Sequence, residues 1–325
     1  MTQDNKAIIY WLNFCCFMVF AMAVIGAITR LTESGLSIVE WHPLMGALPP
    51  LTQHQWDHVY ALYKQSPEFA HKHHWMALED FKKIFFWEWL HRLWGRTIGV
   101  VYALPLLWFW FKKKIPEGYG LKLAGIFLLG GAQGVLGWYM VMSGLVDRPE
   151  VSHFRLAAHL FLALLIFSAM WWVSLSLQKD ETPSVVSKSL RIIGGIALLM
   201  LATTIVWGAF VAGLDAGMIY NTFPLMGGQF TPPETMQPFG FLHQHAWVQF
   251  AHRWLAISTA ILIVIFALRT KNIRLLAMIF IQVGLGISTL LSQVYVPLAA
   301  LHQAGAIVLL ALLIQANHSA LKSVK

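Results

Sequence analysis

The chain has 325 residues, of which 58% are hydrophobic and only 12% are charged, and its mean hydropathy is +0.61. A soluble domain of this length needs far more charge, so the composition predicts an all-α polytopic membrane protein. A net charge of +8 would suggest nucleic acid as the partner of a soluble protein. Here the distribution of that charge over the loops matters more, and no nucleic-acid partner is expected.

Eight apolar segments are long enough to cross a bilayer as helices. We expect them near residues 8–29, 87–111, 121–142, 154–178, 190–213, 246–268, 273–295 and 297–317. Each has roughly the 20 apolar residues that a spanning helix requires. The first segment begins almost at the N-terminus, with no small-residue cleavage site and no Arg/Ser-rich transit stretch, so we expect it to be retained.

Positive residues gather in alternate short loops. They are Lys112, Lys113, Lys114, Lys122, Lys179, Lys188, Arg191, Arg269, Lys271, Arg274, Lys322 and Lys325. Cytoplasmic loops carry an excess of Lys and Arg, so these loops and both termini are predicted to lie inside. The opposite loops hold most of the Asp and Glu and are expected on the periplasmic side.

The first outer loop, near residues 30–86, is too long to be a mere connector. Thr52 and Gln55 match the pattern of a capping box, and Ser66-Pro67-Glu68 opens a second stretch with helix signals. We expect these short helices to cover the pocket of the first half of the chain. The histidines of this loop resemble a metal tract, but surface positions explain them better; they are His54, His58, His71, His73 and His74.

The two halves of the chain repeat. GAITRLTESGLSIVEWHPLMGALPP at 26–50 is echoed by GAFVAGLDAGMIYNTFPLMGGQFTPP at 208–233, and QGVLG at 133–137 by QVGLG at 282–286. Each half has four predicted helices in the same order and the same sense, which indicates a parallel repeat about an axis along the membrane normal. We therefore predict two tandem four-helix bundles, residues 1–180 and 181–325, related by pseudo-two-fold symmetry.

Four histidines recur at equivalent positions of this repeat, each near the periplasmic end of a predicted helix. They are His91, His159, His252 and His302. Histidine inside a membrane is costly unless it has a partner, and two histidines on facing helices can hold one haem iron from both sides. The alternative for any one of them is a hydrogen-bonded packing residue. Other metals are less suited, because no Cys, Asp or Glu except Glu88 lies beside these histidines to complete a tetrahedral shell.

Arginines follow two of these histidines directly. Arg92 and Arg253 lie next to His91 and His252, and Arg96 lies one turn deeper. Guanidinium groups near the outer interface suit haem propionates, which they can hold by charge-assisted pairs. The alternative is that they extend to lipid phosphate, which for Arg96 is equally compatible with the sequence.

The halves differ at one chemically important position. Glu88 precedes His91 by three residues, so both lie on one helical face, whereas the aligned residue before His252 is Gln249. A carboxylate beside a bound tetrapyrrole can take a proton or stabilise a developing cation, and an amide can only hydrogen-bond. The first half is therefore the candidate for chemistry and the second for a structural or electron-transfer haem. The alternative is that Glu88 is an exposed interfacial residue at a helix start.

The chain as a whole resembles the haem A synthase family, in particular its proteobacterial and mitochondrial branch. The resemblance rests on WEWLHRLWGR, TRLTESGLSIVEWHPLMGALPP, QGVLGWYMVMSGL, AHRW at 251–254 and LHQ at 301–303. These motifs occur in order and cover essentially the full length. Some bacterial members carry cysteine pairs in outer loops. Here the only cysteines are Cys15 and Cys16 in the first helix, which suggests a packing role, so the thiol-based electron route of those members cannot be assumed for this chain.

The resemblance implies oxidation of the C8 methyl group of haem O to the formyl group of haem A. It implies that His91 and His159 bind the substrate haem with Glu88 as the catalytic carboxylate, and that His252 and His302 bind a haem b cofactor. It also implies haem O synthase and cytochrome oxidase assembly as functional partners, besides membrane lipid. Without a transit peptide, a bacterial inner membrane is favoured. Association with copies of the same chain is left open.

Two other functions fit parts of the pattern. A di-haem electron-transfer cytochrome needs two bis-histidine haems, but it needs no acid/base residue or long outer loop, and its haems usually lie towards opposite faces. A haem transporter should show a polar path or broken helices that reach the inner side. No such charges occur in the inner halves of the predicted helices.

Overall fold

The computed structural model describes residues 3–40, 47–145, 149–178 and 187–322. Within these ranges the regular structure is helical, apart from one isolated bridge between Met226 and Gln229. Part of the first repeated motif, residues 41–46, and the basic residues Lys179 and Lys325 lie outside the described residues. The prediction of an all-α chain is therefore confirmed for the described part.

Each of the eight apolar segments forms a long helix. They are α1 (Gln3–Leu31), α3 (Leu78–Phe111), α4 (Gly120–Leu145), α5 (His153–Leu177), α6 (Lys188–Gly213), α7 (His245–Arg269), α8 (Ile273–Leu291) and α9 (Val296–Lys322). Four predicted boundaries are wrong by four residues or more. Helix α1 begins at Gln3 instead of residue 8, α3 begins at Leu78 instead of residue 87, and α9 ends at Lys322 instead of residue 317. Helix α8 ends at Leu291 instead of residue 295. It ends early because Gln293 and Val294 adopt left-handed backbone, with φ of 56° and 60°.

Seven of these helices are long and apolar enough to cross a membrane, and the chain is accordingly a multi-pass membrane protein. Helix α3 is not among the seven, although it has 34 residues. Charged side chains, most of them in its first half, and tryptophans in both halves lower the mean hydropathy along this helix.

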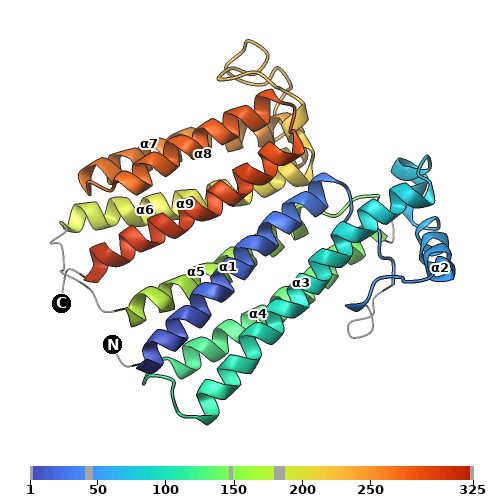
Figure 1. The fold of residues 1–325 in the computed structure, drawn as a ribbon. Coiled ribbons are helices and arrows are strands. Elements are labelled where there is room, and N and C mark those ends of the chain that lie inside the picture. Colours follow the sequence, from blue (N-terminus) through green and yellow to red (C-terminus); the bar gives the residue numbers. More distant parts are fainter. Residues whose placement is uncertain (1–2, 41–46, 146–148, 179–186, 323–325) are drawn as a thin grey trace.

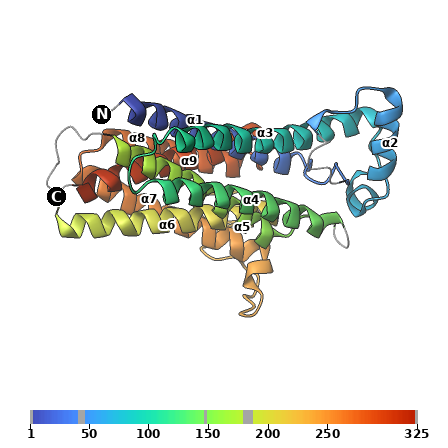
Figure 2. The same cartoon turned by 90° about the horizontal axis from the view of Figure 1, so that it is seen from below.

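The contacts between helices repeat from one half to the other. In the first half α1 packs against α3 and α5, and α4 packs against α3 and α5. In the second half α6 packs against α7 and α9, and α8 packs against α7 and α9. The halves meet where α1 and α5 lie against α9 and where α5 lies against α6 (Figures 1 and 2). Both ends of the chain lie at one end of the molecule (Figure 1).

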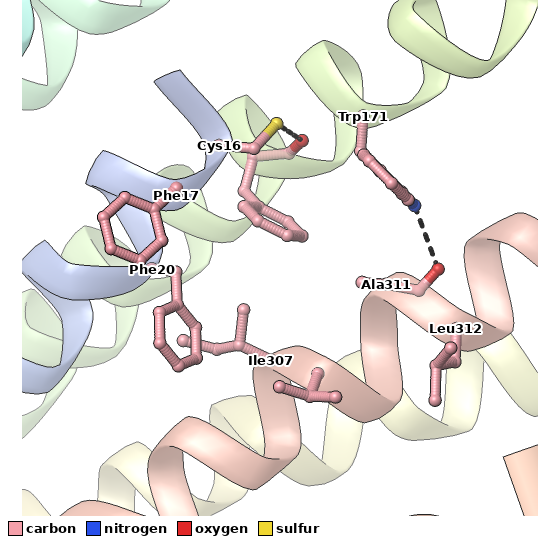
Figure 3. Close-up of a pocket in the computed structure, with 9 residues that line it drawn as sticks. Cys16, Phe17, Phe20, Trp171, Ile307, Ala311 and Leu312 are labelled. Atoms are coloured by element: carbon pink, nitrogen blue, oxygen red, sulfur yellow. Dashed lines mark hydrogen bonds between the residues drawn. The ribbon is translucent and has the colours of Figure 1, made fainter. Parts of the chain in front are cut away.

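Polar contacts join the two halves. At the end that carries the long loops, Arg30 of α1 donates to both carboxylate oxygens of Asp215, each at 3.0 Å. Deeper in the molecule, the indole nitrogen of Trp171 on α5 donates to the carbonyl of Ala311 on α9 at 3.0 Å (Figure 3). These bonds fix α1 and α5 against the second half.

An apolar cavity of about 230 Å³ lies between α1, α5 and α9 (Figure 3). Cys16 lines it, and the Cys16 thiol lies 3.9 Å from the carbonyl oxygen of Phe167. Cys15 and Cys16 are both buried and unpaired, as their predicted packing role requires. The lining residues include none of the four repeated histidines.

The first outer loop contains helices, as predicted. Helix α2 (Gln53–Tyr63) begins at a capping box in which Thr52 and Gln55 cap one another, which confirms that prediction. A π-helical turn, η2 (Phe69–His73), follows. Tyr63, at the end of α2, stacks on Phe81 with the ring centroids 5.0 Å apart, and this contact holds the segment against the start of α3.

The outer-loop histidines are mostly exposed. This confirms the surface interpretation for His54, His58, His71 and His74. It is wrong for His73, which is only 4% exposed because η2 turns its ring inward against Tyr63. In the second half, the loop between α6 and α7 contains two short 3-10 helices, η3 (Ala216–Met218) and η4 (Phe241–His243).

Candidate functional site

The four repeated histidines share one local environment: each ring packs against a glycine of a neighbouring helix. A Cβ atom added to Gly26 on α1 would lie 3.1 Å from Cε1 of His91 on α3. The same distance is 3.0 Å for Gly137 and His159, 3.2 Å for Gly208 and His252, and 2.8 Å for Gly286 and His302. A side chain at any of these glycines would push the imidazole ring aside. All four glycines occupy equivalent positions in the repeat.

The histidines are paired within each half. His91 on α3 and His159 on α5 belong to the first half, and His252 on α7 and His302 on α9 belong to the second. All four histidines are half-buried residues. Among the residues that the structure describes, Nδ1 of His91 and Nδ1 of His252 are buried without a hydrogen-bond partner. The rings are thus oriented mainly by packing.

Two glutamines hold the histidines of the last helix in each half. The amide nitrogen of Gln282 lies 3.1 Å from Nδ1 of His302 and donates to the backbone carbonyl of His302 at 3.0 Å. Gln133 makes the equivalent contacts with His159, at 3.2 Å and 3.0 Å. The Gln133 amide nitrogen also lies 3.2 Å from Nε2 of His159. Such contacts fix the orientation of both imidazole rings.

Glu88 is buried and accepts three hydrogen bonds. It is 3% exposed, and one of its oxygens accepts from the Ser37 hydroxyl and the Ile38 amide, both at 2.7 Å. Its other oxygen accepts from Arg92 at 2.6 Å. Since an ionised carboxylate only accepts hydrogen bonds, three donors match its charged form. The alternative of an exposed residue at a helix start is wrong, because Glu88 lies well inside α3 and is covered by the loop after α1.

The equivalent position in the second half has a different hydrogen-bond pattern. There the Gln249 amide donates to the carbonyl of Tyr220 at 3.2 Å, whereas Glu88 accepts from the amide of Ile38. Ile38 and Tyr220 occupy equivalent positions in the repeat. The two halves therefore use one framework, with a negative charge in the first half and a neutral amide in the second.

The arginines beside the histidines contact the outer loops. Arg92 donates to the carbonyl of Ile38 at 2.9 Å, and Arg253 donates to the equivalent carbonyl of Tyr220 at 3.3 Å. Arg253 also donates to the carbonyls of Pro224 and Leu225, both at 2.9 Å. Each guanidinium group therefore holds an outer loop against the helix that carries the histidine.

Other polar residues lie near the site without joining it. Arg96 is half-buried one turn beyond Arg92. The exposed His243 packs edge-on against His153, with the ring centroids 5.0 Å apart, and His245 is exposed at the start of α7. Within the described ranges no group of three or more His, Cys, Asp or Glu could hold a metal ion. A haem iron needs at most two ligands from the protein, and the paired histidines can supply them.

Comparison with known proteins identifies the family. Residues 9–314 match the model of the COX15-CtaA family, described as cytochrome oxidase assembly proteins. The chain is 51% identical to haem A synthase of Rhodospirillum centenum over 96% of this chain and 88% of that protein. It is 47% identical to haem A synthase of Nitrosospira multiformis over 97% of this chain and 93% of that protein.

The chain belongs to the haem A synthase family. A third family member, from Nitrosomonas eutropha, is 43% identical over 95% of this chain and 92% of its own length. The region matched to the haem A synthase family includes Glu88 and all four repeated histidines.

The sequence analysis did not identify the glutamines and glycines that contact the histidines, although both recur in the sequence. The repeated QGVLG and QVGLG segments each place a glutamine four residues before a glycine, and both residues contact the same histidine. The glutamine and the glycine recur beside His159 and His302, and this repeated position assigns them to the site.

Proposed function

We propose that the chain is a haem A synthase that oxidises the C8 methyl group of haem O to the formyl group of haem A. The observation that carries this proposal is the repeated histidine-glycine framework, in which one half adds a buried carboxylate. The proposal makes the chain an oxidoreductase of haem biosynthesis, because the methyl carbon loses electrons and protons as it gains oxygen.

In this proposal each pair of histidines holds one haem. His91 and His159 bind the substrate haem O, and His252 and His302 bind a haem b cofactor. Haem b supplies one-electron chemistry when bound. Two half-buried histidines in each half, each with its ring held against a glycine of a neighbouring helix, support this assignment, because such a pair would hold one haem iron.

Glu88 is the proposed catalytic carboxylate. It stabilises positive charge or accepts a proton beside the methyl group that reacts, whereas Gln249 in the haem b half cannot. Three donors hold it as an anion in a buried setting, where a charge acts more strongly than it does in water. Arg92, Arg253 and Arg96 are the proposed propionate contacts.

We propose that α3 is an eighth membrane span, so that residues 1–180 and 181–325 form two four-helix bundles related by pseudo-two-fold symmetry along the membrane normal. The repeated helix contacts and the repeated histidine-glycine contacts support this arrangement. The distribution of Lys and Arg supports cytoplasmic termini and haem sites near the periplasmic face. The bacterial relatives support a bacterial inner membrane. Haem O synthase and the cytochrome oxidase assembly machinery are the proposed partners, and association of the chain with itself is left open.

Haem extraction from cells tests the reaction. Cells that express this chain together with a haem O synthase should contain haem A, while cells that express either protein alone should not. A chain that binds haem yet leaves haem O unconverted in the paired strain would instead be an electron-transfer cytochrome.

The glycine contacts make a separate prediction about haem b. Gly286→Ala should lower the haem b content of the purified protein, because the new Cβ would lie 2.8 Å from Cε1 of His302. Disturbed support of a metal ligand costs roughly 10- to 100-fold in metal affinity. The measurement is the visible haem spectrum per mole of protein.

Gly284→Ala is the matched control for this prediction. It makes the same change two residues earlier on α8, where a Cβ would meet no atom within 4 Å. Both variants gain the same helix propensity, so that contribution cancels. Equal haem b content in the two variants would show that the close contact with His302 does not matter.

A further inference from the structure

A group of buried titratable side chains lies in the outer segment, apart from the histidine pairs. Tyr63, Glu68 and His73 are 0%, 3% and 4% exposed. They belong to the end of α2, the turn before η2, and η2 itself. Buried carboxylates are rare unless a partner or a proton neutralises them. The proposed reaction assigns these three residues no role.

The tyrosine hydroxyl connects the other two groups. It lies 3.0 Å from a carboxylate oxygen of Glu68 and 2.6 Å from Nδ1 of His73. A hydroxyl has only one proton to donate, so the cluster can hold one extra proton in two arrangements that satisfy all three groups. In one, protonated Glu68 donates to Tyr63, and Tyr63 donates to neutral His73. In the other, Tyr63 donates to ionised Glu68 and accepts from charged His73. Both arrangements hold one shared proton.

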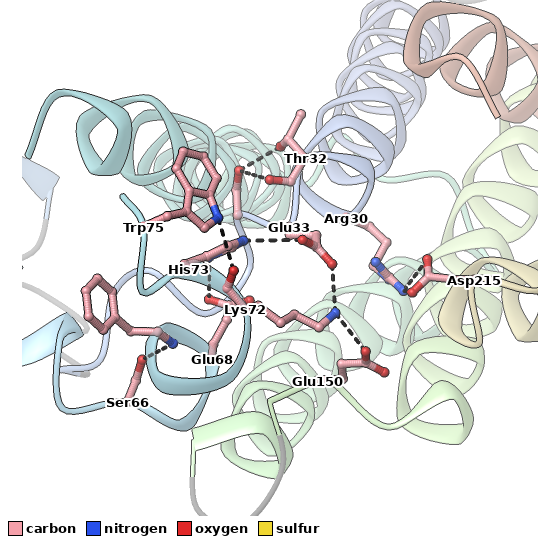
Figure 4. Close-up of polar contacts among 12 residues, drawn as sticks. Arg30, Thr32, Glu33, Ser66, Glu68, Lys72, His73, Trp75, Glu150 and Asp215 are labelled. Atoms are coloured by element: carbon pink, nitrogen blue, oxygen red, sulfur yellow. Dashed lines mark hydrogen bonds and ion pairs between the residues drawn. The ribbon is translucent and has the colours of Figure 1, made fainter. Parts of the chain in front are cut away.

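The histidine continues this chain to the surface. Nε2 of His73 lies 3.3 Å from a carboxylate oxygen of Glu33, whose side chain is 38% exposed. Lys72 pairs with both Glu33 and Glu150, each at 2.7 Å (Figure 4). Glu33 directly follows the last turn of α1, so the chain of contacts joins the outer segment to the membrane helices.

The charges and the burial around Glu68 indicate that it loses its proton near neutral pH. Burial, together with the negative charges of Glu88 and Glu33, raises the pKa of Glu68 to about 8. Burial also raises the pKa of Tyr63, and the charges of Glu68, Glu88 and Glu33 add to that effect. The hydrogen bond from His73, helped by Lys72, lowers the pKa of Glu33 to about 2, so Glu33 stays ionised.

We infer that Glu68, Tyr63 and His73 form a buried site for one proton, which exchanges with outer water through Glu33 and responds to charge in the pocket of Glu88. In the exchange, the O–H bond of Glu68 breaks as Tyr63 accepts that proton, and Tyr63 gives its own proton to Nδ1 of His73. Glu68 becomes a carboxylate and His73 an imidazolium, so the total charge is unchanged and nothing is oxidised. His73 then releases its Nε2 proton towards Glu33 and water.

Such a site would balance charge during turnover. Positive charge that develops beside Glu88 weakens the binding of the proton in the cluster. When that proton leaves through Glu33, its loss offsets the new positive charge. This role rests on the proposed function. The proton site itself does not, because it can be titrated in resting protein.

Infrared difference spectroscopy of the purified protein over a pH titration tests the inference. Wild-type protein should show a carboxylic-acid C=O band that disappears as the pH rises through about 8. The band should be absent in Glu68→Gln. In Glu88→Gln it should disappear at lower pH, because loss of the negative neighbour weakens proton binding at Glu68. Tyr63→Phe should also shift the titration, since it removes the bridge between Glu68 and His73.

Glu79→Gln is the matched control. It removes an exposed carboxylate from α3 and should leave the band and its titration unchanged. A band that persists in Glu68→Gln, or no carboxylic-acid band in wild-type protein, overturns the protonated Glu68 from which the exchange starts. An unshifted titration in Glu88→Gln overturns its response to the pocket. Absence of haem A formation by wild-type protein would count against the proposed function alone.

Discussion

His252→Ala or His302→Ala removes most of the bound haem b from the purified protein, because one axial ligand is lost and the iron keeps a single imidazole. The affinity for haem b should fall by more than the roughly 10- to 100-fold that is typical when only the supporting contacts of a metal ligand are disturbed. The measurement is the low-spin haem b spectrum per mole of protein. Product formation should fall with it, because the cofactor for electron transfer is gone.

His91→Ala and His159→Ala are the internal controls, since their rings pack against equivalent glycines in the other half. They should keep the haem b spectrum and lose haem A formation. If they lose haem b while the C-terminal variants keep it, the two halves have been assigned the wrong way round. Unchanged spectra in both C-terminal variants would remove the haem b assignment altogether.

Hydropathy located the eight long helices, because bilayer-length apolar runs leave a strong signal. It placed the start of α3 too late, because the first turns of α3 are amphipathic. There Phe81 packs against Tyr63 of the outer segment, while Lys82 and Lys83 pair with acidic residues one turn earlier. A search for apolar runs cannot detect such an extension, whose stability comes from a tertiary contact.

The repeat identified the candidate residues, but not what surrounds them. The asymmetry between Glu88 and Gln249 is visible in the sequence. The burial of Glu88 is not, because its donors Ser37 and Ile38 come from a loop whose path no periodicity encodes. For the same reason His73 was expected on the surface. Only the π-helical turn brings its ring against Tyr63.

Glu88→Gln cuts haem A yield on the order of 100-fold, the range found when an acid/base or charge-stabilising group is removed. The amide keeps the size of the side chain and copies Gln249 of the haem b half. Haem b content should therefore remain at the wild-type level, while haem O or a hydroxylated intermediate accumulates. The measurement is the haem composition of extracts from cells that also express a haem O synthase.

A structural role for Glu88 must be separated from a chemical one, because the carboxylate also holds the loop after α1 and pairs with Arg92. Ser37→Ala separates them: it removes one donor to Glu88, at a cost of about 1.5–3 kcal/mol for a hydrogen bond to a charged group, and leaves the charge in place. If the charge matters for the reaction, Ser37→Ala retains most of the haem A yield that Glu88→Gln loses. Equal losses in the two variants, with intact haem b in both, would make Glu88 an anchor for the loop and leave the first pocket without its acid or base.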